Sequence, residues 1–320
     1  MTFASSRRWL ATGLFIAGCA DAPIEPAEPE EPLSAPPGFP LLKTPADNEA
    51  TLARRSLGRR LFYDERLSST GEVSCASCHL QANAFADPNA LSTGVEGRQG
   101  TRNAPALINL AWGKSFFWDG RTATLELQAA EPIQNHVEMN NTLEVASARL
   151  AKDKALSEQF QRAYAAAPSK NTITRALASF VRSLISAQSR YDAFLTGDTA
   201  ALDPAEQRGQ ALFTGERGDC FHCHVGYNLT SQGFRNNGIA ADDPDVGRSE
   251  ITSKPTDLGK FKTPTLRNVA VTAPYMHDGS LATLEDVVAQ YDAGGRGHEN
   301  TDPLIRPLGL TDDEKADLVA

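Results

Sequence analysis

The pattern Cys-x-x-Cys-His occurs twice in this chain, as Cys75-Ala76-Ser77-Cys78-His79 and as Cys220-Phe221-His222-Cys223-His224. It is typical of c-type haem attachment: one turn of chain places two thiols beside the two vinyl groups of one porphyrin, and the next residue offers an imidazole to the iron. A zinc site and a redox dithiol are the alternatives. Zinc ribbons usually separate their cysteine pairs by roughly 15–20 residues, and a dithiol needs no histidine after both pairs. The sequence therefore predicts a fold built around two covalently bound haem c groups.

The composition of the chain restricts its class. With 320 residues, 41% of them hydrophobic and 22% charged, the chain is long enough for one large domain or two modest ones with a buried core. A net charge of −9 argues against a nucleic-acid partner, which requires clustered lysine and arginine. No apolar run reaches the roughly 18 residues of a membrane-spanning helix. Five cysteines are too few for a disulfide-dense scaffold of this size.

The N-terminus has the features of an export signal. Two arginines precede an uncharged apolar stretch, and Ile16-Ala17-Gly18-Cys19 resembles the lipobox of bacterial lipoproteins. We therefore expect a lipoprotein signal peptide at residues 1–18 and a periplasmic protein anchored to a membrane through lipidated Cys19. Plain secretion, with this cysteine incidental, is the alternative. Residues 19–46 hold eight prolines and five acidic residues, which predicts an extended, solvated tether.

The rest of the chain is predicted to be mainly α-helical. Apolar residues follow a helical spacing at 143–165 and at 172–186, whereas strand-like alternation is scarce. Capping residues predict three further helices, beginning at Asp203, Thr283 and Thr311.

Two related halves are indicated by the residues that precede each haem motif, Leu57–Phe62 and Arg208–Phe213. We expect a first, peroxidatic cytochrome c domain at 47–195 and a second, electron-transfer cytochrome c domain at 196–320. Each would bind one haem between long loops.

Several further segments give the chain a resemblance to a known family. They are Leu61-Phe62-Tyr63-Asp64, Arg102-Asn103-Ala104-Pro105, Phe117-Trp118-Asp119-Gly120-Arg121, Pro132 through Glu138-Met139, Thr265-Leu266-Arg267-Asn268-Val269, and Thr272-Ala273-Pro274-Tyr275-Met276-His277-Asp278-Gly279. In this order, with both haem motifs, they make the chain resemble the bacterial di-haem cytochrome c peroxidases and, within them, the MauG-like branch. The tether, the sequence Tyr275-Met276-His277-Asp278-Gly279 and the residues around Glu138-Met139 are most similar to those of the MbnH-like enzymes.

This resemblance implies a haem-dependent oxidoreductase with hydrogen peroxide as acceptor. Enzymes of the MauG and MbnH type form a high-valent bis-Fe(IV) state and oxidise a residue of a partner protein. The resemblance thus implies a periplasmic protein substrate similar to MbnP, with a tryptophan as the oxidised residue.

The resemblance also implies that the two irons differ, although His79 and His224 would each bind one. In the peroxidases a distal histidine lies sixteen residues after the first haem histidine; here that position is Val95, which cannot bind iron. The first haem would then be open to peroxide. The methionine that binds the second iron in the peroxidases is replaced by Tyr291, and MauG also has tyrosine there. The alternative for Tyr291 is a buried phenol with a hydrogen-bonded hydroxyl.

Three more residues match catalytic positions of the family. Gln128 and Glu138 match the polar pair over the open haem, where a carboxylate would take a proton from one peroxide oxygen and return it to the other. Trp118 matches the tryptophan between the haems, whose indole would relay oxidising equivalents. The plainer alternatives are a solvated turn for Glu138 and core packing for Trp118.

A calcium site between the haems is implied as well. Asn103 and the carbonyl oxygens of Thr272 and Pro274 match it, and an all-oxygen set suits Ca²⁺. We expect His277 to form hydrogen bonds in this region rather than to bind iron.

Two other functions remain open from the sequence. The first is a cytochrome c peroxidase that reduces hydrogen peroxide with electrons from a small cytochrome c or a cupredoxin. The second is a di-haem electron carrier, which would need both irons six-coordinate.

Overall fold

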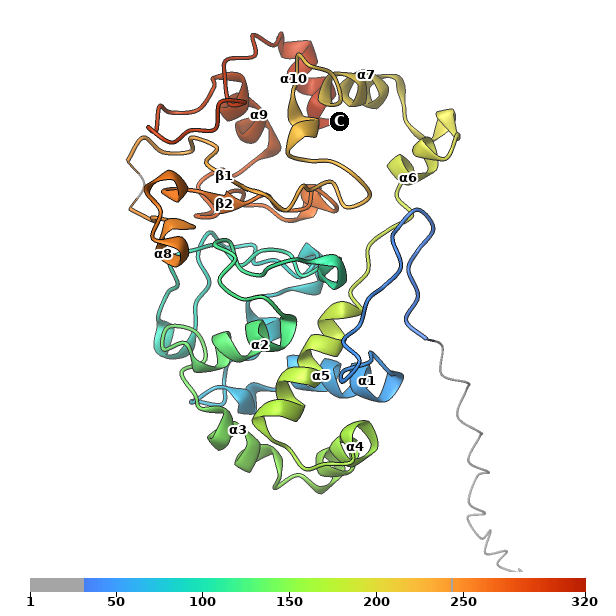
Figure 1. Ribbon diagram of the computed structural model, residues 1–320, viewed down its shortest axis with the longest axis vertical. Coiled ribbons are helices and arrows are strands. Elements are labelled where there is room, and N and C mark those ends of the chain that lie inside the picture. The colour runs from blue at the N-terminus through green and yellow to red at the C-terminus, as the bar shows by residue number, and fades with distance from the viewer. Residues whose placement is uncertain (1–31, 243) are drawn as a thin grey trace, which may run out of the picture. The chain divides into compact units, whose positions relative to one another are not determined.

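The structure, a computed structural model, describes residues 32–242 and 244–320 (Figure 1). The expected signal peptide, Cys19 and the first part of the expected tether lie outside these residues. Within them, no helix combines the length and the apolar character needed to span a membrane.

The predicted mainly helical fold is confirmed. The α-helices of the described chain are α1 (Leu52–Phe62), α2 (Leu125–Gln134), α3 (Leu143–Leu150), α4 (Lys154–Tyr164), α5 (Lys170–Arg182), α6 (Arg190–Leu195), α7 (Pro204–Phe213), α8 (Ser249–Thr252), α9 (Leu284–Asp292) and α10 (Asp312–Val319).

Strands are short in the described chain. β1 (Phe234–Arg235) pairs antiparallel with β2 (Phe261–Lys262). Short 3₁₀ turns and loops make up most of the remainder, and both haem motifs lie on such turns, at Cys75–Ser77 and Cys220–His222.

The helix starts follow the predicted capping residues. The side chains of Asp203, Thr283 and Thr311 accept backbone N–H groups at the first turns of α7, α9 and α10. The helical spacing expected over 143–165 corresponds to two helices, α3 and α4. Asp153 accepts the backbone N–H of Leu156 and so begins a new helix within this apolar pattern.

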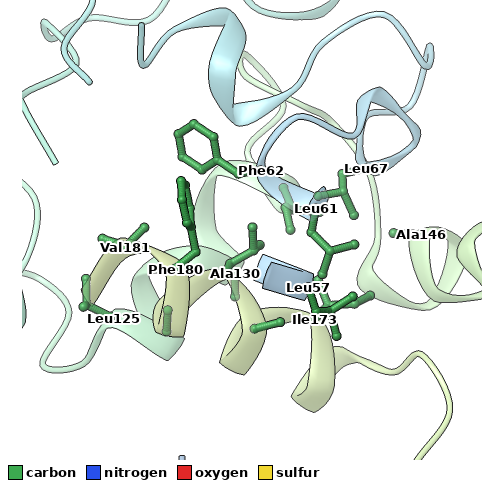
Figure 2. Close-up of a cluster of buried hydrophobic side chains, with 14 of the residues drawn as sticks. Leu57, Leu61, Phe62, Leu67, Leu125, Ala130, Ala146, Ile173, Phe180 and Val181 are labelled. Carbon is green, nitrogen blue, oxygen red and sulfur yellow. The ribbon is translucent and has the colours of Figure 1, made fainter. Parts of the chain in front are cut away.

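The first half is organised by the crossing of α1 and α5. Leu57, Leu61 and Phe62 of α1 pack against Ile173 and Phe180 of α5 in a buried hydrophobic cluster (Figure 2). The two backbones are so close that a β-carbon on Gly58 would lie 1.9 Å from the carbonyl oxygen of Ala176. Only glycine fits at this crossing.

The second half repeats this crossing with α7 and α10. A β-carbon on Gly209 of α7 would lie 1.8 Å from the carbonyl oxygen of Asp317 in α10. Gly58 and Gly209 occupy the same place in the two similar sequences that precede the haem motifs. The expected relation between the halves therefore extends to how their helices pack.

A longer repeat of structure follows each haem motif. Asn109 and Asn268 both have left-handed backbone conformations and both precede a 3₁₀ turn. A β-bridge closes the next loop in each half, and a threonine then caps a helix, Thr124 for α2 and Thr283 for α9. All of these features lie 159 positions apart. Each residue from 109 to 132 thus has a structural equivalent in the second half.

The segment before α1 lies against both halves. The ring of Phe39 is 5.0 Å from the rings of Trp112 and Tyr227, measured between centroids, and the guanidinium of Arg267 lies over it at 4.8 Å. The indole N–H of Trp112 donates to the carbonyl oxygen of Pro40 at 3.0 Å. The expected solvated tether is therefore wrong for this part of residues 19–46, because the ring of Phe39 packs against aromatic side chains of both halves.

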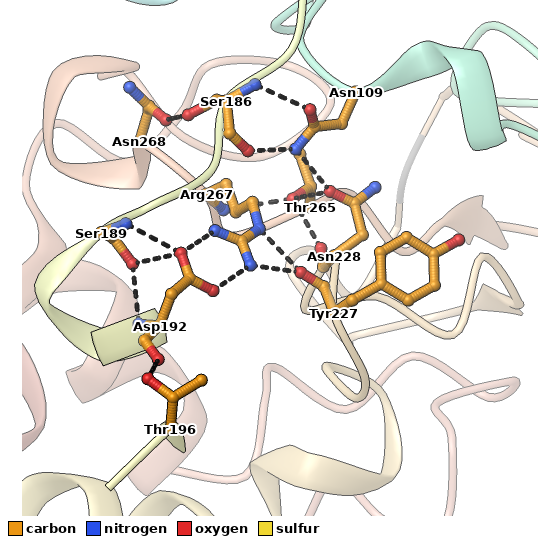
Figure 3. A network of polar contacts seen from close by, with 10 residues as sticks. All are labelled: Asn109, Ser186, Ser189, Asp192, Thr196, Tyr227, Asn228, Thr265, Arg267 and Asn268. Atoms are coloured by element: carbon orange, nitrogen blue, oxygen red, sulfur yellow. Dashed lines mark hydrogen bonds and ion pairs between the residues drawn. The ribbon is translucent and has the colours of Figure 1, made fainter. Parts of the chain in front are cut away.

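A polar network joins the segment between the halves to the second half (Figure 3). Arg267 forms a two-pronged ion pair with Asp192 of α6, at 2.7 and 2.8 Å, and also donates to the carbonyl oxygen of Tyr227. The side chain of Asn109, from the first half, donates to the Asn228 side chain at 3.0 Å and to the carbonyl oxygen of Ser186 at 2.8 Å. These contacts fix the two halves against each other.

Candidate active site

A single cavity of about 970 Å³ is lined by both Cys-x-x-Cys-His motifs. It lies at the upper end of the range of about 300–1,000 Å³ that is usual for ligand sites. Its wall includes most of the residues singled out from the sequence. These are Cys75, Cys78, His79, Asn103, Trp118, Gln128, Glu138, Cys220, Cys223, His224, Thr272, Pro274, His277 and Tyr291. The fold thus gathers them around one space.

The two motif histidines are oriented alike by their loops. Nδ1 of His79 lies 2.7 Å from the carbonyl oxygen of Phe85, and Nδ1 of His224 lies 3.1 Å from that of Leu229. A carbonyl oxygen can only accept, so Nδ1 carries the proton in both rings and Nε2 keeps a free lone pair. Burial lowers the pKa of both histidines, that of His224 to about 4. Both rings are therefore neutral at pH 7, the form that binds iron.

The motif cysteines complete a donor set that fits haem c. All four thiols are free of disulfide bonds. Two thiols and one neutral imidazole at each motif, on the wall of one large cavity, match the covalent and axial bonds that a c-type haem requires.

Glu138 is held by the amide of Asn135. The Asn135 Nδ2 donates to Oε1 of Glu138 at 2.6 Å, which fixes one carboxylate oxygen. Burial raises the pKa of Glu138 above its usual value, although the hydrogen bond from Asn135 opposes this shift. Gln128, on α2, lines the same cavity. A buried carboxylate with a raised pKa is suited to taking up and returning a proton.

Val95 lies in the protein interior, where only 1% of its surface is exposed. Its backbone N–H donates to the carbonyl oxygen of Glu138 at 2.8 Å. A β-carbon on the preceding Gly94 would lie 2.2 Å from the carbonyl oxygen of Val137, so the two segments are in close contact. Val95 is not among the residues of the cavity wall. Val95 therefore supports the Glu138 segment through its backbone and does not line the cavity.

The internal repeat shows a difference between the two sides of the cavity. The eighth residue of α2 is Pro132 and the eighth residue of α9 is Tyr291, and both line the cavity. Proline has no side-chain donor, whereas a phenol oxygen can bind iron. The two halves therefore offer different chemistry at equivalent positions.

Tyr291 is buried beside a second candidate ligand. Nδ2 of Asn237 lies 3.4 Å from the Tyr291 hydroxyl oxygen and 3.0 Å from Sδ of Met276. Burial raises the pKa of Tyr291, and the hydrogen bond from Asn237 acts in the opposite direction. The other methionine of the described chain, Met139, is buried in the first-half core and also lines the cavity.

Trp118 lies where the two halves meet. Its indole N–H donates to the carbonyl oxygen of Asn103 at 2.8 Å, and its own carbonyl oxygen accepts the backbone N–H of Lys262 from β2. The Lys262 ammonium donates to the carbonyl oxygen of Ser115 at 2.8 Å, and burial lowers its pKa to about 8. The indole thus has a fixed position between segments of both halves.

The residues expected to bind calcium lie together on the cavity wall. The backbone N–H of Asn103 donates to the carbonyl oxygen of His277 at 2.7 Å, and its amide Nδ2 donates to that of Asn89 at 2.9 Å. With Nδ2 so engaged, the amide oxygen is the atom left to meet a cation. His277 is buried and stacks on Phe261, with 3.6 Å between ring centroids. The calcium ion itself stays a prediction.

Three residues of this site could not be recognised in the sequence. Asn135, Asn237 and Lys262 act through hydrogen bonds that depend on the folded chain. Asn135 lies three residues before Glu138, and this spacing was the one available signal. Asn237, in a loop, and Lys262, in β2, lie far along the sequence from the residues they contact, and no local pattern marks them.

Comparisons with known proteins agree with this geometry. The family described as di-haem cytochrome c peroxidase matches residues 53–200. The cytochrome-c peroxidase IdrP1 of Denitromonas iodatirespirans is 36% identical and aligns over 88% of this chain and 84% of its own. The methylamine utilization protein MauG of Methylorubrum extorquens is also 36% identical, over 86% of this chain and 79% of its own.

Solved structures are similar over nearly the same length. The crystal structure of a MauG-like protein associated with microbial copper homeostasis has a TM-score of 0.84 and 38% sequence identity, and covers 89% of this chain and 92% of that one. A variant of the diheme peroxidase BthA from Burkholderia thailandensis has a TM-score of 0.74 and 25% identity, with 83% and 84% covered.

Proposed function

Because the chain belongs to the family of di-haem cytochrome c peroxidases, which are haem oxidoreductases that act on peroxide, we propose that it is an enzyme of the MauG and MbnH kind. It would use hydrogen peroxide to oxidise a residue of a partner protein. Each peroxide accepts two electrons and two protons and leaves as two waters, and the partner's side chain loses those electrons and protons. A tryptophan of an MbnP-like protein is the proposed target.

Two haem c groups are the cofactors that this family membership implies, and they supply peroxide binding and the storage of two oxidising equivalents. The residues of the first half would handle peroxide. Pro132 has no donor atom, which supports free access to the cavity beside His79. Glu138, fixed by Asn135, would take a proton from one peroxide oxygen and deliver it to the other. Gln128 would orient the peroxide by hydrogen bonding.

The residues of the second half would stabilise the oxidised state. Tyr291 and His224 would hold the iron of the second haem, and a phenolate would favour ferric and more oxidised iron. The single observation that carries the proposal is the pair of equivalent helix positions, with Pro132 in one half and Tyr291 in the other. An electron carrier would need a sixth ligand on both irons.

Trp118 would pass electrons between the halves. Its indole N–H donates to a backbone carbonyl oxygen, which cannot take up a proton. The indole can therefore lose and regain an electron without losing its proton. Asn103, which supplies that carbonyl, is also the proposed calcium ligand together with the carbonyls of Thr272 and Pro274, so a bound Ca²⁺ would stabilise the position of Trp118.

The proposed place of action is the periplasm. Haem attachment and a secreted partner both require export, and a lipid on Cys19 would hold the enzyme at a membrane. We propose two cytochrome c domains, at 47–195 and 196–320, with their boundary at the end of α6.

The decisive experiment is mass spectrometry of the proposed MbnP-like partner protein after incubation with holoenzyme and peroxide. We expect the partner's tryptophan to lose two electrons and two protons for each peroxide consumed, and any oxygen that it gains to come from water that adds to the oxidised ring. The competing function is reduction of peroxide with electrons from a small cytochrome c or a cupredoxin, which the names of several relatives favour. An unmodified partner together with rapid oxidation of reduced cytochrome c would select that function instead.

A further inference from the structure

The second half places two potential iron ligands on the cavity wall, whereas the first half places none at the equivalent positions. Tyr291 and Met276 both line the cavity that His224 also lines. Their equivalents, 159 positions earlier, are Pro132 and Phe117, whose side chains have no atom that could bind iron. Two side-chain atoms are therefore candidate ligands of the second iron, the phenol oxygen of Tyr291 and the thioether sulfur of Met276.

One amide group contacts both candidates. Nδ2 of Asn237 lies 3.0 Å from Sδ of Met276 and 3.4 Å from the hydroxyl oxygen of Tyr291. This nitrogen carries two hydrogens and cannot accept. Both the sulfur and the phenol oxygen are thus acceptors, each facing one N–H.

The two candidates differ in mobility. Tyr291 is on α9, and the neighbouring Gln290 ties this helix to the loop of Asn237 by donating to the carbonyl oxygen of Gly238 at 3.0 Å. Met276 sits in a loop with a positive φ of 77°, and its side chain has three rotatable bonds. The phenol is therefore held in place by its helix, whereas the thioether needs a contact to hold it.

We propose that Asn237 selects Tyr291 over Met276 as the ligand of the second haem iron. One N–H of Asn237 donates to a lone pair of the Met276 sulfur and holds the thioether away from the iron. Its second N–H supports negative charge on the Tyr291 oxygen, because donation to a phenol oxygen favours the phenolate. Asn237 is a positioning residue, and this inference rests on the proposed binding of Tyr291 to iron.

The test compares variants of the holoprotein by two readouts, the iron–phenolate signature in resonance Raman spectra and the reduction potential of the second haem. Asn237→Leu keeps the size of the side chain and removes both donors. We expect the phenolate signature to be lost, a methionine–iron signature to appear, and the potential to rise, because a thioether favours ferrous iron. The double variant Asn237→Leu/Met276→Leu should regain the phenolate signature, since the competing sulfur is gone.

Control variants separate the possible failures. Asn300→Leu makes the same change at an amide that donates to the carbonyl oxygen of Pro255 at 2.9 Å and does not line the cavity, and should keep the phenolate signature. Asn237→Asp preserves the shape even more closely and should lose the signature as Asn237→Leu does. A wild-type spectrum and potential in both Asn237 variants, or an equal loss in Asn300→Leu, would overturn the selection by Asn237. Tyr291→Phe tests the underlying ligation: if it leaves the spectrum unchanged, the proposed role of Tyr291 and this inference both fail.

Discussion

Asn135 and burial act in opposite directions on the proton affinity of Glu138. Burial disfavours the carboxylate and raises its pKa, whereas the amide donor of Asn135, 2.6 Å away, favours the charged form. Arg121 lowers the same pKa and Glu131 raises it, both by weaker charge interactions. A group that must accept a proton from peroxide needs this balance, because only the unprotonated carboxylate can act as the base.

The first prediction concerns the pH dependence of the peroxide reaction. Asn135→Leu removes a contact that lowers the pKa of Glu138, so that pKa rises further. The rate of reaction with peroxide increases as Glu138 deprotonates, and its midpoint should therefore move to higher pH in the variant. Stopped-flow spectroscopy of the haems across pH measures this. Gln134→Leu, on the same helix end and bonded to Ala130 instead, should leave the midpoint in place. An unmoved midpoint in Asn135→Leu would contradict the proposed coupling.

The second prediction separates peroxide chemistry from oxidation of the partner. Trp118→Phe preserves an aromatic ring but makes it much harder to oxidise. We expect the variant still to react with peroxide, and the yield of modified partner to fall to the background level in mass spectra. Trp112→Phe is the matched control, because Trp112 packs on Phe39 and Tyr227 and is not part of the cavity wall. Equal losses in both variants would argue against a relay through Trp118.

Among the helices, the two glycine crossings carry the internal repeat. Gly58 and Gly209 let α1 approach α5, and α7 approach α10, more closely than any side chain would allow. The first helix of each pair, α1 or α7, ends shortly before a haem motif in the sequence. The helix pairs thus form the support on which Cys75 and Cys220 are presented to the cavity.

The third prediction tests one of these crossings. In Gly209→Ala the new β-carbon would lie 1.8 Å from the carbonyl oxygen of Asp317, so α10 must move away. We expect a loss of about 1–3 kcal/mol in the free energy of unfolding, as is usual for overpacking. Denaturant titration of the holoprotein measures it. Gly100→Ala, whose nearest atom would be 3.9 Å away, should cost much less. A stable Gly209→Ala variant would mean that the close crossing is not required.

At the scale of the whole molecule, the described segment before α1, residues 32–51, connects the two halves and is called the strap here. Phe39 contacts Trp112 of the first half and Tyr227 of the second, and Arg267 covers its ring. Arg267 in turn pairs with Asp192, between the halves. The relative position of the two haem-binding halves therefore depends on a segment whose composition resembles a linker.

The fourth prediction tests the strap. Phe39→Ala removes the aromatic contacts to both halves. We expect the free energy of unfolding to fall by about 1–3 kcal/mol, less than the roughly 3–5 kcal/mol of a fully buried phenylalanine, because Phe39 is only half-buried. Leu41→Ala, in the same segment, should change little because Leu41 is 84% exposed. Thermal unfolding of both variants provides the comparison, and equal stabilities would show that the strap does not couple the halves.

The sequence predicted well whatever depends on neighbouring residues. Helix starts at Asp203, Thr283 and Thr311 follow from side chains that bond backbone groups two or three positions away. The apolar spacing at 143–165 does not show the break between α3 and α4, because this spacing continues across Asp153, whose carboxylate caps a new helix. Phe39 was misjudged because proline-rich composition says nothing about an aromatic pocket formed by distant residues.

The sequence by itself determined the two haem motifs, the mainly helical class and the family, since each follows from covalent spacing, from local hydrogen bonding or from the order of motifs along one chain. Only the tertiary structure decided that Asn135 holds Glu138, that Asn237 lies between Tyr291 and Met276, and that Phe39 bridges the halves. These contacts join residues through single hydrogen bonds or ring faces. Such contacts have no fixed spacing in sequence, because the packing of loops around a common cavity sets which side chains meet.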